Sequence, residues 1–192
     1  MGLTKQAKTL NKTQVALLLA MLDRTRYPAR NRVIALLSLK AGLRAKEIAN
    51  LSWDMVLEPD GALATSMHLR NSASKGKSGR IIPLNKELRA ALQDLRLRKC
   101  SGKYVITTER SDKFCAQAMV NLFSAWFNKL GLQGCSSHSG RRTFITNAAR
   151  KISTVGGSLR DVQMLAGHSA LTTTQRYIET DALAQTKIVD II

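Results

Sequence analysis

The sequence has few cysteines, no long apolar segment and few acidic residues. Its three cysteines, Cys100, Cys115 and Cys135, are an odd number without metal-ligand spacing, so we expect free thiols in a reducing compartment and neither a disulfide nor a zinc site. The longest apolar run, residues 15–22, is far shorter than the roughly 20 residues that cross a bilayer. The first ten residues contain no apolar signal core and no myristoylation signal. The sequence therefore predicts a cytoplasmic protein with no membrane partner and no metal.

The shortage of acidic residues leaves a large positive charge. Thirty Lys and Arg against 13 Asp and Glu give a net charge of +17 over 192 residues. The basic excess is present in residues 1–50, 70–113 and 114–192, so it is not confined to a tail. Because the chain is also 44% hydrophobic, this charge predicts a folded domain with a basic face, and nucleic acid is the expected partner.

Helical patterns occupy the first fifty residues and return after residue 85. Asn11 with Gln14 resembles a capping box, and the apolar residues after it recur at helical spacing, which predicts a helix over residues 12–23. A second predicted helix, over residues 29–41, ends at Gly42. Further helices are predicted over residues 46–51, 86–98, 116–130, 139–150, 158–166, 171–178 and 181–189, and Asn85 is the predicted cap of the helix over 86–98.

Between these helical stretches the pattern changes to that of short strands. Three antiparallel strands and one isolated strand are predicted, over residues 53–57, 64–69, 80–84 and 104–107. A polar loop over residues 71–79 separates the second strand from the third. There is no internal repeat and no linker between two globules. The sequence predicts a mainly α domain with a small antiparallel β-sheet, an α+β fold.

Four stretches carry residues suited to phosphodiester chemistry. They are AGLRAKEIANLSW at 41–53, SKGKSGRIIPL at 74–84, HSGRRTF at 138–144 and LAGHSALTTTQRY at 165–177. In this order they resemble the catalytic domain of the tyrosine recombinases, the phage integrase family, over roughly residues 10–180. The resemblance implies that family's catalytic-domain fold. It also implies a site-specific DNA recombinase that cleaves and rejoins DNA through a 3′-phosphotyrosyl intermediate.

Two of these stretches supply the residues expected to bind the scissile phosphate. By resemblance, the first catalytic arginine is Arg44, supported by the acid Glu47, and the second is Arg141, in a box that begins with His138. Two guanidinium groups can clamp a phosphate and stay charged while negative charge grows on its oxygens. Three other basic residues are expected to contact DNA: Lys77, Arg80 and Arg142.

The other two stretches supply a nucleophile and an acid. Tyr177 resembles the family's nucleophile, and His168, nine residues earlier, is the expected hydrogen-bond partner of the phosphate. A tyrosine has an ordinary pKa of about 10, so a neighbouring base or positive charge must help it to attack. The leaving 5′-oxygen needs a proton. Counting back eight residues from Pro83, as in the family pattern, selects Lys75 over Lys77 as that acid.

The sequence leaves several alternatives open. His138 and His168 could each bind the phosphate or assist proton transfer. Lys75 could contact only the DNA backbone and contribute to affinity without acting as an acid. A type IB topoisomerase and a DNA-binding regulator with a vestigial catalytic set are the alternatives to a recombinase. Gly140 stands where the family has a large apolar residue, and Arg142 where a second histidine is common. The packing beneath Arg141 is therefore expected to differ from the family pattern.

The resemblance also predicts a domain organisation and an assembly. Residues 1–192 are expected to form a single catalytic domain, with an integrase-like core at 10–180 and a C-terminal segment at 181–192 that could dock on a neighbouring subunit. The family's N-terminal core-binding domain is expected to be absent. The expected partner is double-stranded DNA, bound by a homotetramer on two sites, and without DNA the chain is expected to be monomeric or weakly associated. No cofactor is expected, because the phosphotyrosyl link conserves the bond energy.

Overall fold

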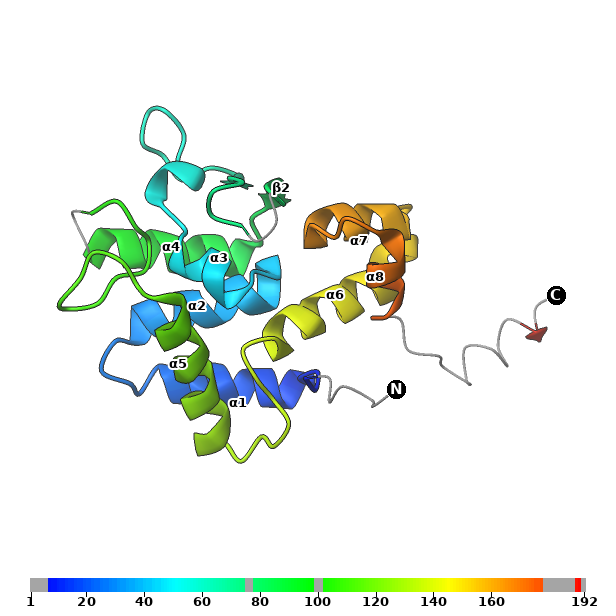
Figure 1. Cartoon of the computed structure of the whole chain (residues 1–192), viewed down its shortest axis with the longest axis horizontal. Coiled ribbons are helices and arrows are strands. Elements are labelled where there is room, and N and C mark those ends of the chain that lie inside the picture. The colour runs from blue at the N-terminus through cyan, green and yellow to red at the C-terminus, as the bar shows by residue number, and fades with distance from the viewer. Residues whose placement is uncertain (1–6, 75–77, 99–101, 178–188, 191–192) are drawn as a thin grey trace.

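A computed structural model describes residues 7–74, 78–98, 102–177 and 189–190 of the chain. In these ranges the protein forms eight α-helices, two short 3₁₀ helices and one sheet of two antiparallel strands (Figure 1). The predicted fold class, mainly α with a small antiparallel sheet, is confirmed. None of the helices in the described ranges has the length and the apolar character needed to cross a membrane.

The elements follow the predicted order closely. The helices are α1 (Lys12–Leu22), α2 (Pro28–Ala41), α3 (Ala45–Ala49), α4 (Lys86–Arg98), α5 (Ala116–Lys129), α6 (Ser139–Lys151), α7 (Leu159–Ala166) and α8 (Leu171–Gln175). The 3₁₀ helices are η1 (Trp53–Met55) and η2 (Ile152–Val155), and the strands are β1 (Ser66–Leu69) and β2 (Arg80–Pro83). The predicted helix over residues 181–189 lies almost wholly outside the described residues.

Local signals account for the ends of the first two helices. The Asn11 side chain accepts a hydrogen bond from the Gln14 N–H, and the Gln14 side chain accepts one from the Asn11 N–H, so the predicted capping box is present. Pro28 begins α2, where its missing N–H costs nothing. Gly42, with φ +64°, ends that helix in the left-handed conformation that favours glycine. Arg44 follows this turn and directly precedes α3.

Two of the four predicted strands are wrong, those over residues 53–57 and 104–107. Residues 53–55 form η1, and nearby only isolated bridges join Leu57 to Leu63 and Ser52 to Tyr104. The Ser52 hydroxyl donates to the carboxylate of Asp54, and such a local bond competes with the ladder of a strand. The isolated strand predicted over residues 104–107 is likewise reduced to this one bridge. The other two predicted strands pair as β1 and β2, with Leu69 opposite Arg80.

Helix α2 is the centre of the larger of two hydrophobic clusters. Its residues 33–39 are all buried, and α1, α4 and α6 pack against it, while α5 packs on α3. The smaller cluster is built on Ile145, Val162 and Ala166, with Tyr177 partly buried against it. Helix α6 therefore runs from the main helical body to the unit formed by α7 and α8 (Figure 1). The candidate site lies where these two parts meet.

Helices α2 and α6 approach each other closely at Ser38 and Gly140. A Cβ at position 140 would lie 2.3 Å from the Ser38 Oγ and 2.9 Å from the Ser38 Cβ. Both residues are buried, and the Ser38 Oγ has no hydrogen-bond partner in the described part of the chain. Gly140 thus allows α6 to lie directly on α2, immediately before Arg141 in the sequence.

We expect Gly140→Ala to lower the free energy of unfolding by about 1–3 kcal/mol, because the added methyl group overpacks this contact. Urea denaturation measures the change. Ser38→Ala alone should be nearly neutral, since it removes an unpartnered hydroxyl, and in combination it should restore part of the loss by removing the nearer atom. If Gly140→Ala were as stable as the wild type, the close helix contact would be contradicted.

Candidate active site

The candidate site draws its residues from segments far apart in the sequence. Arg44 lies between α2 and α3, and Glu47 lies within α3. Arg141 is in the first turn of α6. His168 follows Gly167, which has φ +63° and ends α7, and Tyr177 comes two residues after α8. Gly42 and Gly167, both left-handed, thus place Arg44 and His168 just beyond the ends of α2 and α7.

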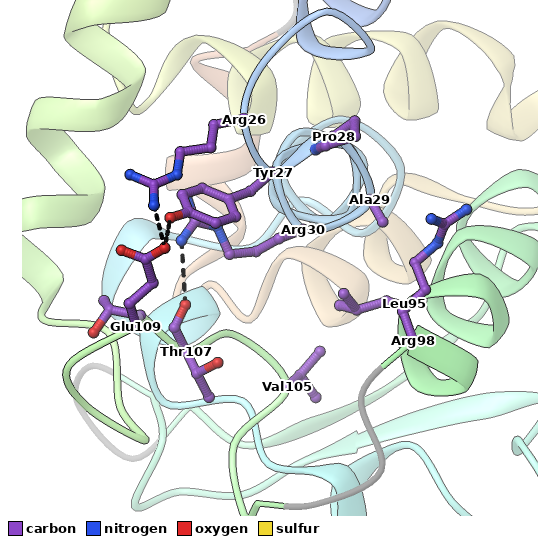
Figure 2. A pocket seen from close by; sticks show the side chains of 11 residues that line it. Arg26, Tyr27, Pro28, Ala29, Arg30, Leu95, Arg98, Val105, Thr107 and Glu109 are labelled. Atoms are coloured by element: carbon purple, nitrogen blue, oxygen red, sulfur yellow. Dashed lines mark hydrogen bonds and ion pairs between the residues drawn. The ribbon is translucent and has the colours of Figure 1, made fainter.

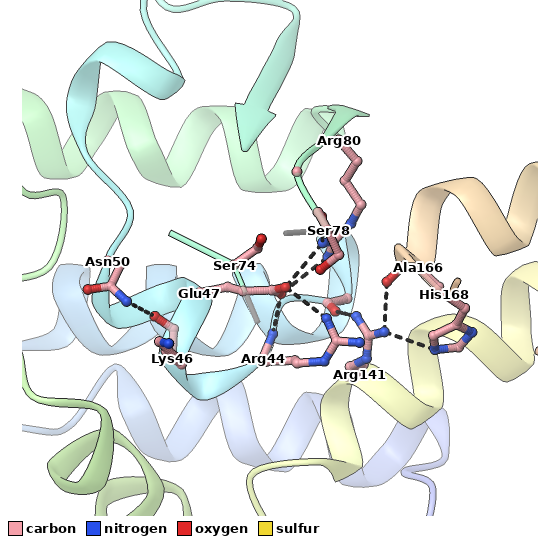
Figure 3. A network of polar contacts seen from close by, with 12 residues as sticks. Arg44, Lys46, Glu47, Asn50, Ser74, Ser78, Arg80, Arg141, Ala166 and His168 are labelled. Carbon is pink, nitrogen blue, oxygen red and sulfur yellow. Dashed lines mark hydrogen bonds and ion pairs between the residues drawn. The ribbon is translucent and has the colours of Figure 1, made fainter. Parts of the chain in front are cut away.

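The acid Glu47 is completely buried and holds Arg44. Its carboxylate accepts hydrogen bonds from the Arg44 N–H and from the Arg44 guanidinium, both at 2.8 Å, and two more from Arg80 (Figure 3). Burial raises the pKa of the Glu47 carboxyl, but Arg80 and Arg44 outweigh it and hold the pKa below its ordinary value. Glu47 is therefore an anion that orients Arg44, whose side chain stays 23% exposed.

Arg141 lies beneath this pair and is only 3% exposed. Its guanidinium donates to the carbonyl of Gly42 at 2.6 Å and to the carbonyl of Ala166 at 2.7 Å. Burial lowers the pKa of Arg141 to about 10, with a further contribution from Arg44, so the group remains a cation at neutral pH. Arg141 ties the end of α2 to the end of α7 and lines the same pocket as Tyr177.

His168 lies between Arg141 and Thr174. Its Nε2 is 3.0 Å from an Arg141 Nη, and its Nδ1 is 2.9 Å from the Thr174 hydroxyl. Because an arginine can only donate, Nε2 must accept, and the neutral imidazole carries its proton on Nδ1. The ring also stacks on Tyr177, with centroids 5.5 Å apart. Burial, and then the charges of three arginines led by Arg141, lower the pKa of His168 to about 4.

We expect His168 to titrate near pH 4 instead of near 6.5, with the proton on Nδ1 above that pH. Two-dimensional ¹H–¹⁵N NMR of the imidazole measures both properties. Because the folded pKa is depressed, the unfolded chain binds this proton more tightly. The free energy of unfolding should therefore fall as the pH drops from about 6.5 to about 4 and stay unaffected by His168 above that range.

Thr174→Val is the control for the tautomer, because it removes only the acceptor of the Nδ1 proton. The variant should keep the proton on Nδ1, because Arg141 still donates to Nε2. A midpoint near 6.5, or a wild-type proton on Nε2, would contradict the described contacts of His168.

Two pockets collect the predicted catalytic residues of the described chain. His138, Arg141 and Tyr177 line a pocket of about 350 Å³, which Arg142 also lines. A second pocket, of about 890 Å³, is lined by Arg44 and His168, among others. The wall of both pockets includes the same residue, Thr173. The structure therefore brings together five of the six predicted catalytic residues. Lys75, and the predicted DNA contact Lys77, lie outside the described residues.

Sequence reasoning missed two contacts of the site. Thr174, fully buried, holds His168, and its only signal is a position three residues before Tyr177. Arg80 was predicted as a DNA contact, but the structure places its guanidinium on Glu47. The signal for that contact is weak, because a basic residue after a polar loop is normally exposed.

A third pocket, of about 350 Å³, contains none of the predicted site residues (Figure 2). The Glu109 carboxylate there accepts hydrogen bonds from Arg26 and from the Tyr27 hydroxyl, and Arg30 lies over the Tyr27 ring. The polar groups of Arg26, Tyr27 and Glu109 therefore bond to one another, and the remaining wall is mainly apolar. Although arginines and a tyrosine line this pocket, Arg26 and Tyr27 are engaged by Glu109, and the lining includes no histidine.

Comparisons with known proteins agree with the motifs and the fold. The model of the phage integrase family matches residues 8–183. The tyrosine recombinase XerA of Thermococcus kodakarensis is 31% identical over 177 residues, and XerC of Syntrophus aciditrophicus is 30% identical over 163 residues. These alignments cover 88% and 79% of this chain, but the chain spans only 57% and 49% of the two relatives.

Solved structures show the same fold. A crystal structure of XerA recombinase superposes with a TM-score of 0.71 at 24% identity, covering 95% of this chain and 64% of that one. The Tn1549 transposon integrase in complex with a circular intermediate DNA gives a TM-score of 0.75 at 20% identity, covering 97% and 67%. The fold predicted from the four motifs is confirmed.

Proposed function

Because this chain belongs to the phage integrase family, we propose that it is a site-specific recombinase that cleaves and rejoins DNA through Tyr177. The observation that carries the proposal is the convergence of Arg44, His138, Arg141, His168 and Tyr177 on two pockets that share one wall residue. The curated relatives bear the name tyrosine recombinase, which also supports it. No observation favours the topoisomerase or the regulator.

In the proposed reaction, the two arginines bind the scissile phosphate. Arg44 is oriented by the Glu47 carboxylate and reaches the larger pocket, while Arg141 stays cationic although buried. Their positive charge neutralises the charge that grows on the phosphoryl oxygens. His168, neutral at pH 7, orients the Arg141 guanidinium through Nε2.

Tyr177 then attacks phosphorus through its hydroxyl oxygen. The new Tyr–phosphate bond forms as the bond to the 5′-oxygen breaks, and the tyrosine proton passes to a base. His138 is exposed and lines the pocket of Tyr177, so we assign it this proton transfer. Lys75 is proposed to protonate the leaving 5′-oxygen. Attack of the released 5′-hydroxyl of a partner strand reverses these steps and rejoins the DNA.

The substrate is proposed to be double-stranded DNA, met in the cytoplasm. Solved structures with this fold include XerH bound to its difH substrate and a lambda integrase dimer bound to a core site. Lys77 and Arg142 are proposed to bind backbone phosphates.

We also propose a domain organisation and an assembly. Residues 10–180 form the catalytic core, active assemblies are homotetramers on two sites, and residues 181–192 dock on a neighbouring subunit.

The test uses a nicked suicide substrate, from which the cleaved fragment diffuses away and leaves the enzyme attached. The binding site is first selected from a random duplex library, and the selected duplex is then nicked next to each candidate phosphate. Incubation in EDTA should give a covalent protein–DNA band on a denaturing gel. Binding without any covalent band, at every nick position, would contradict the proposed function.

A further inference from the structure

Arg80 belongs to the buried centre of the site. It begins β2 beside a polar loop, yet its side chain is only 6% exposed. Its two Nη atoms each donate to one oxygen of Glu47 at 3.1 Å, and its Nε donates to the carbonyl of Leu165 at 2.8 Å. Every nitrogen of this guanidinium therefore has a partner within the protein (Figure 3).

The Glu47 carboxylate links Arg80 to Arg44. Its Oε1 accepts from the side chains of both arginines, and its Oε2 accepts from the Arg80 side chain and the Arg44 N–H. A guanidinium that binds both oxygens of a buried carboxylate fixes the orientation of that carboxylate. Arg80 thereby also fixes the acceptor on which the Arg44 guanidinium rests.

The other contacts of Arg80 reach the segment that carries His168. Leu165 lies three residues before His168, and Gly167 directly precedes it. A Cβ at position 167 would lie 2.9 Å from an Arg80 Nη and 3.0 Å from the Arg80 Cδ. Gly167 therefore serves two purposes, because it adopts φ +63° and leaves the space that Arg80 fills.

We propose that Arg80 is a positioning residue for strand cleavage, which fixes Arg44 through Glu47 and fixes the His168 turn through Leu165 and Gly167. This inference rests on the proposed function, because Arg44 and His168 act on a phosphate only if the protein cleaves DNA. It replaces the direct contact with DNA expected from the sequence context. Arg80 lines the larger pocket, but all three nitrogens of its guanidinium already donate to protein acceptors, and a direct phosphate contact would have to break its pairing with both oxygens of Glu47.

The first experiment separates positioning from DNA binding. Arg80→Met should slow single-turnover cleavage of the pre-bound suicide substrate by about 10- to 100-fold. This range is the one found when a residue that orients the ligand of a metal site is removed. The salt dependence of DNA binding should not change. A phosphate contact would instead lower the slope of log K against log salt by about 0.9. That result, with an unchanged cleavage rate, would overturn the proposal.

Arg70→Met is the matched control, because Arg70 directly follows Leu69, the residue that pairs with Arg80, and its side chain is 59% exposed. It removes the same charge from the same hairpin. Its cleavage rate in the bound complex should equal that of the wild type. A loss as large as that of Arg80→Met would assign the effect to net charge and overturn the proposal.

A double-mutant cycle tests whether Arg80 acts through Arg44. If it does, Arg44→Met and Arg80→Met in one chain should slow cleavage little more than Arg44→Met alone, since the positioned group is already gone. Multiplied losses would mean that Arg80 acts independently of Arg44, and would overturn this part of the proposal.

Hydrogen exchange of the free protein needs no DNA and keeps the inference separate from the proposed function. In Arg80→Met, the amides of Arg44 and His168 should exchange at least about tenfold faster, while the amide of Leu92, in the core of α4, should not change. Uniform acceleration, or none, would overturn the proposal. Arg80→Lys, which keeps the charge without the two-pronged contact, provides the same comparison if Arg80→Met does not fold. A wild type that never cleaves DNA would refute the proposed function but leave this result to decide the role of Arg80.

Discussion

Replacing Tyr177 by phenylalanine should abolish covalent attachment to DNA and leave DNA binding intact. The substitution removes only the oxygen that attacks phosphorus, so strand cleavage should fall by at least about 10⁴-fold. The fold should not change. The ring that stacks on His168 is kept, and so are the backbone contacts of residue 177 with Thr174 and Thr146. The readouts are the covalent band on a denaturing gel and the Kd for the same DNA.

Tyr104→Phe is the matched control for Tyr177→Phe. Tyr104 lies near Lys103 and Lys113, in the loop before α5, and its ring packs with their ammonium groups. Its hydroxyl has no place in the proposed reaction, so the covalent band should persist at the wild-type level. A band that survives Tyr177→Phe would mean that another group attacks the phosphate.

Replacing Arg141 by lysine should damage both the fold and the reaction. Arg141 donates to the carbonyls of Gly42 and Ala166 from a buried position, and a single ammonium group cannot reach both. We expect the free energy of unfolding to fall by about 2–4 kcal/mol, since a buried group left without its partner costs about 1–3 kcal/mol. Cleavage should fall by about 10²- to 10³-fold, the usual effect of removing one donor to a transition-state oxyanion.

Arg44→Lys separates the two effects. The Arg44 side chain is partly exposed, and a lysine there could keep an ion pair with Glu47, so the stability should change by less than about 1 kcal/mol. The loss of cleavage should be comparable with that of Arg141→Lys. Equal losses of stability in the two variants, measured by urea denaturation, would contradict the different environments of the two arginines.

The helices could be predicted because their signals are local. Asn11 and Gln14 lie three residues apart and bond to each other, and Gly42 ends α2 by its own conformation. The prediction of a strand over residues 53–57 failed, because the sequence pattern there did not reveal that the Ser52 hydroxyl would bond to Asp54 and that residues 53–55 would form η1.

In the candidate site, too, residues in short local motifs could be predicted and a contact between distant residues could not. Arg44, Arg141 and Tyr177 could be named because each lies in a short motif that resembles a catalytic segment of the phage integrase family. The role of Arg80 could not be found, because its partner Glu47 lies 33 residues earlier and only the folded chain shows that both are buried. Prediction therefore reached the groups suited to act on a phosphate, but not the contact that holds one of them in place.

The central claim, that Tyr177 becomes bonded to DNA, can be tested directly by mass spectrometry of the covalent complex. The chain has three tyrosines, and trypsin cleavage after Arg176 and Lys187 yields a peptide that contains only the last of them. After nuclease digestion, this peptide should carry a nucleotide through its 3′-phosphate on Tyr177. A nucleotide on any other residue, or one linked through a 5′-phosphate, would contradict the account.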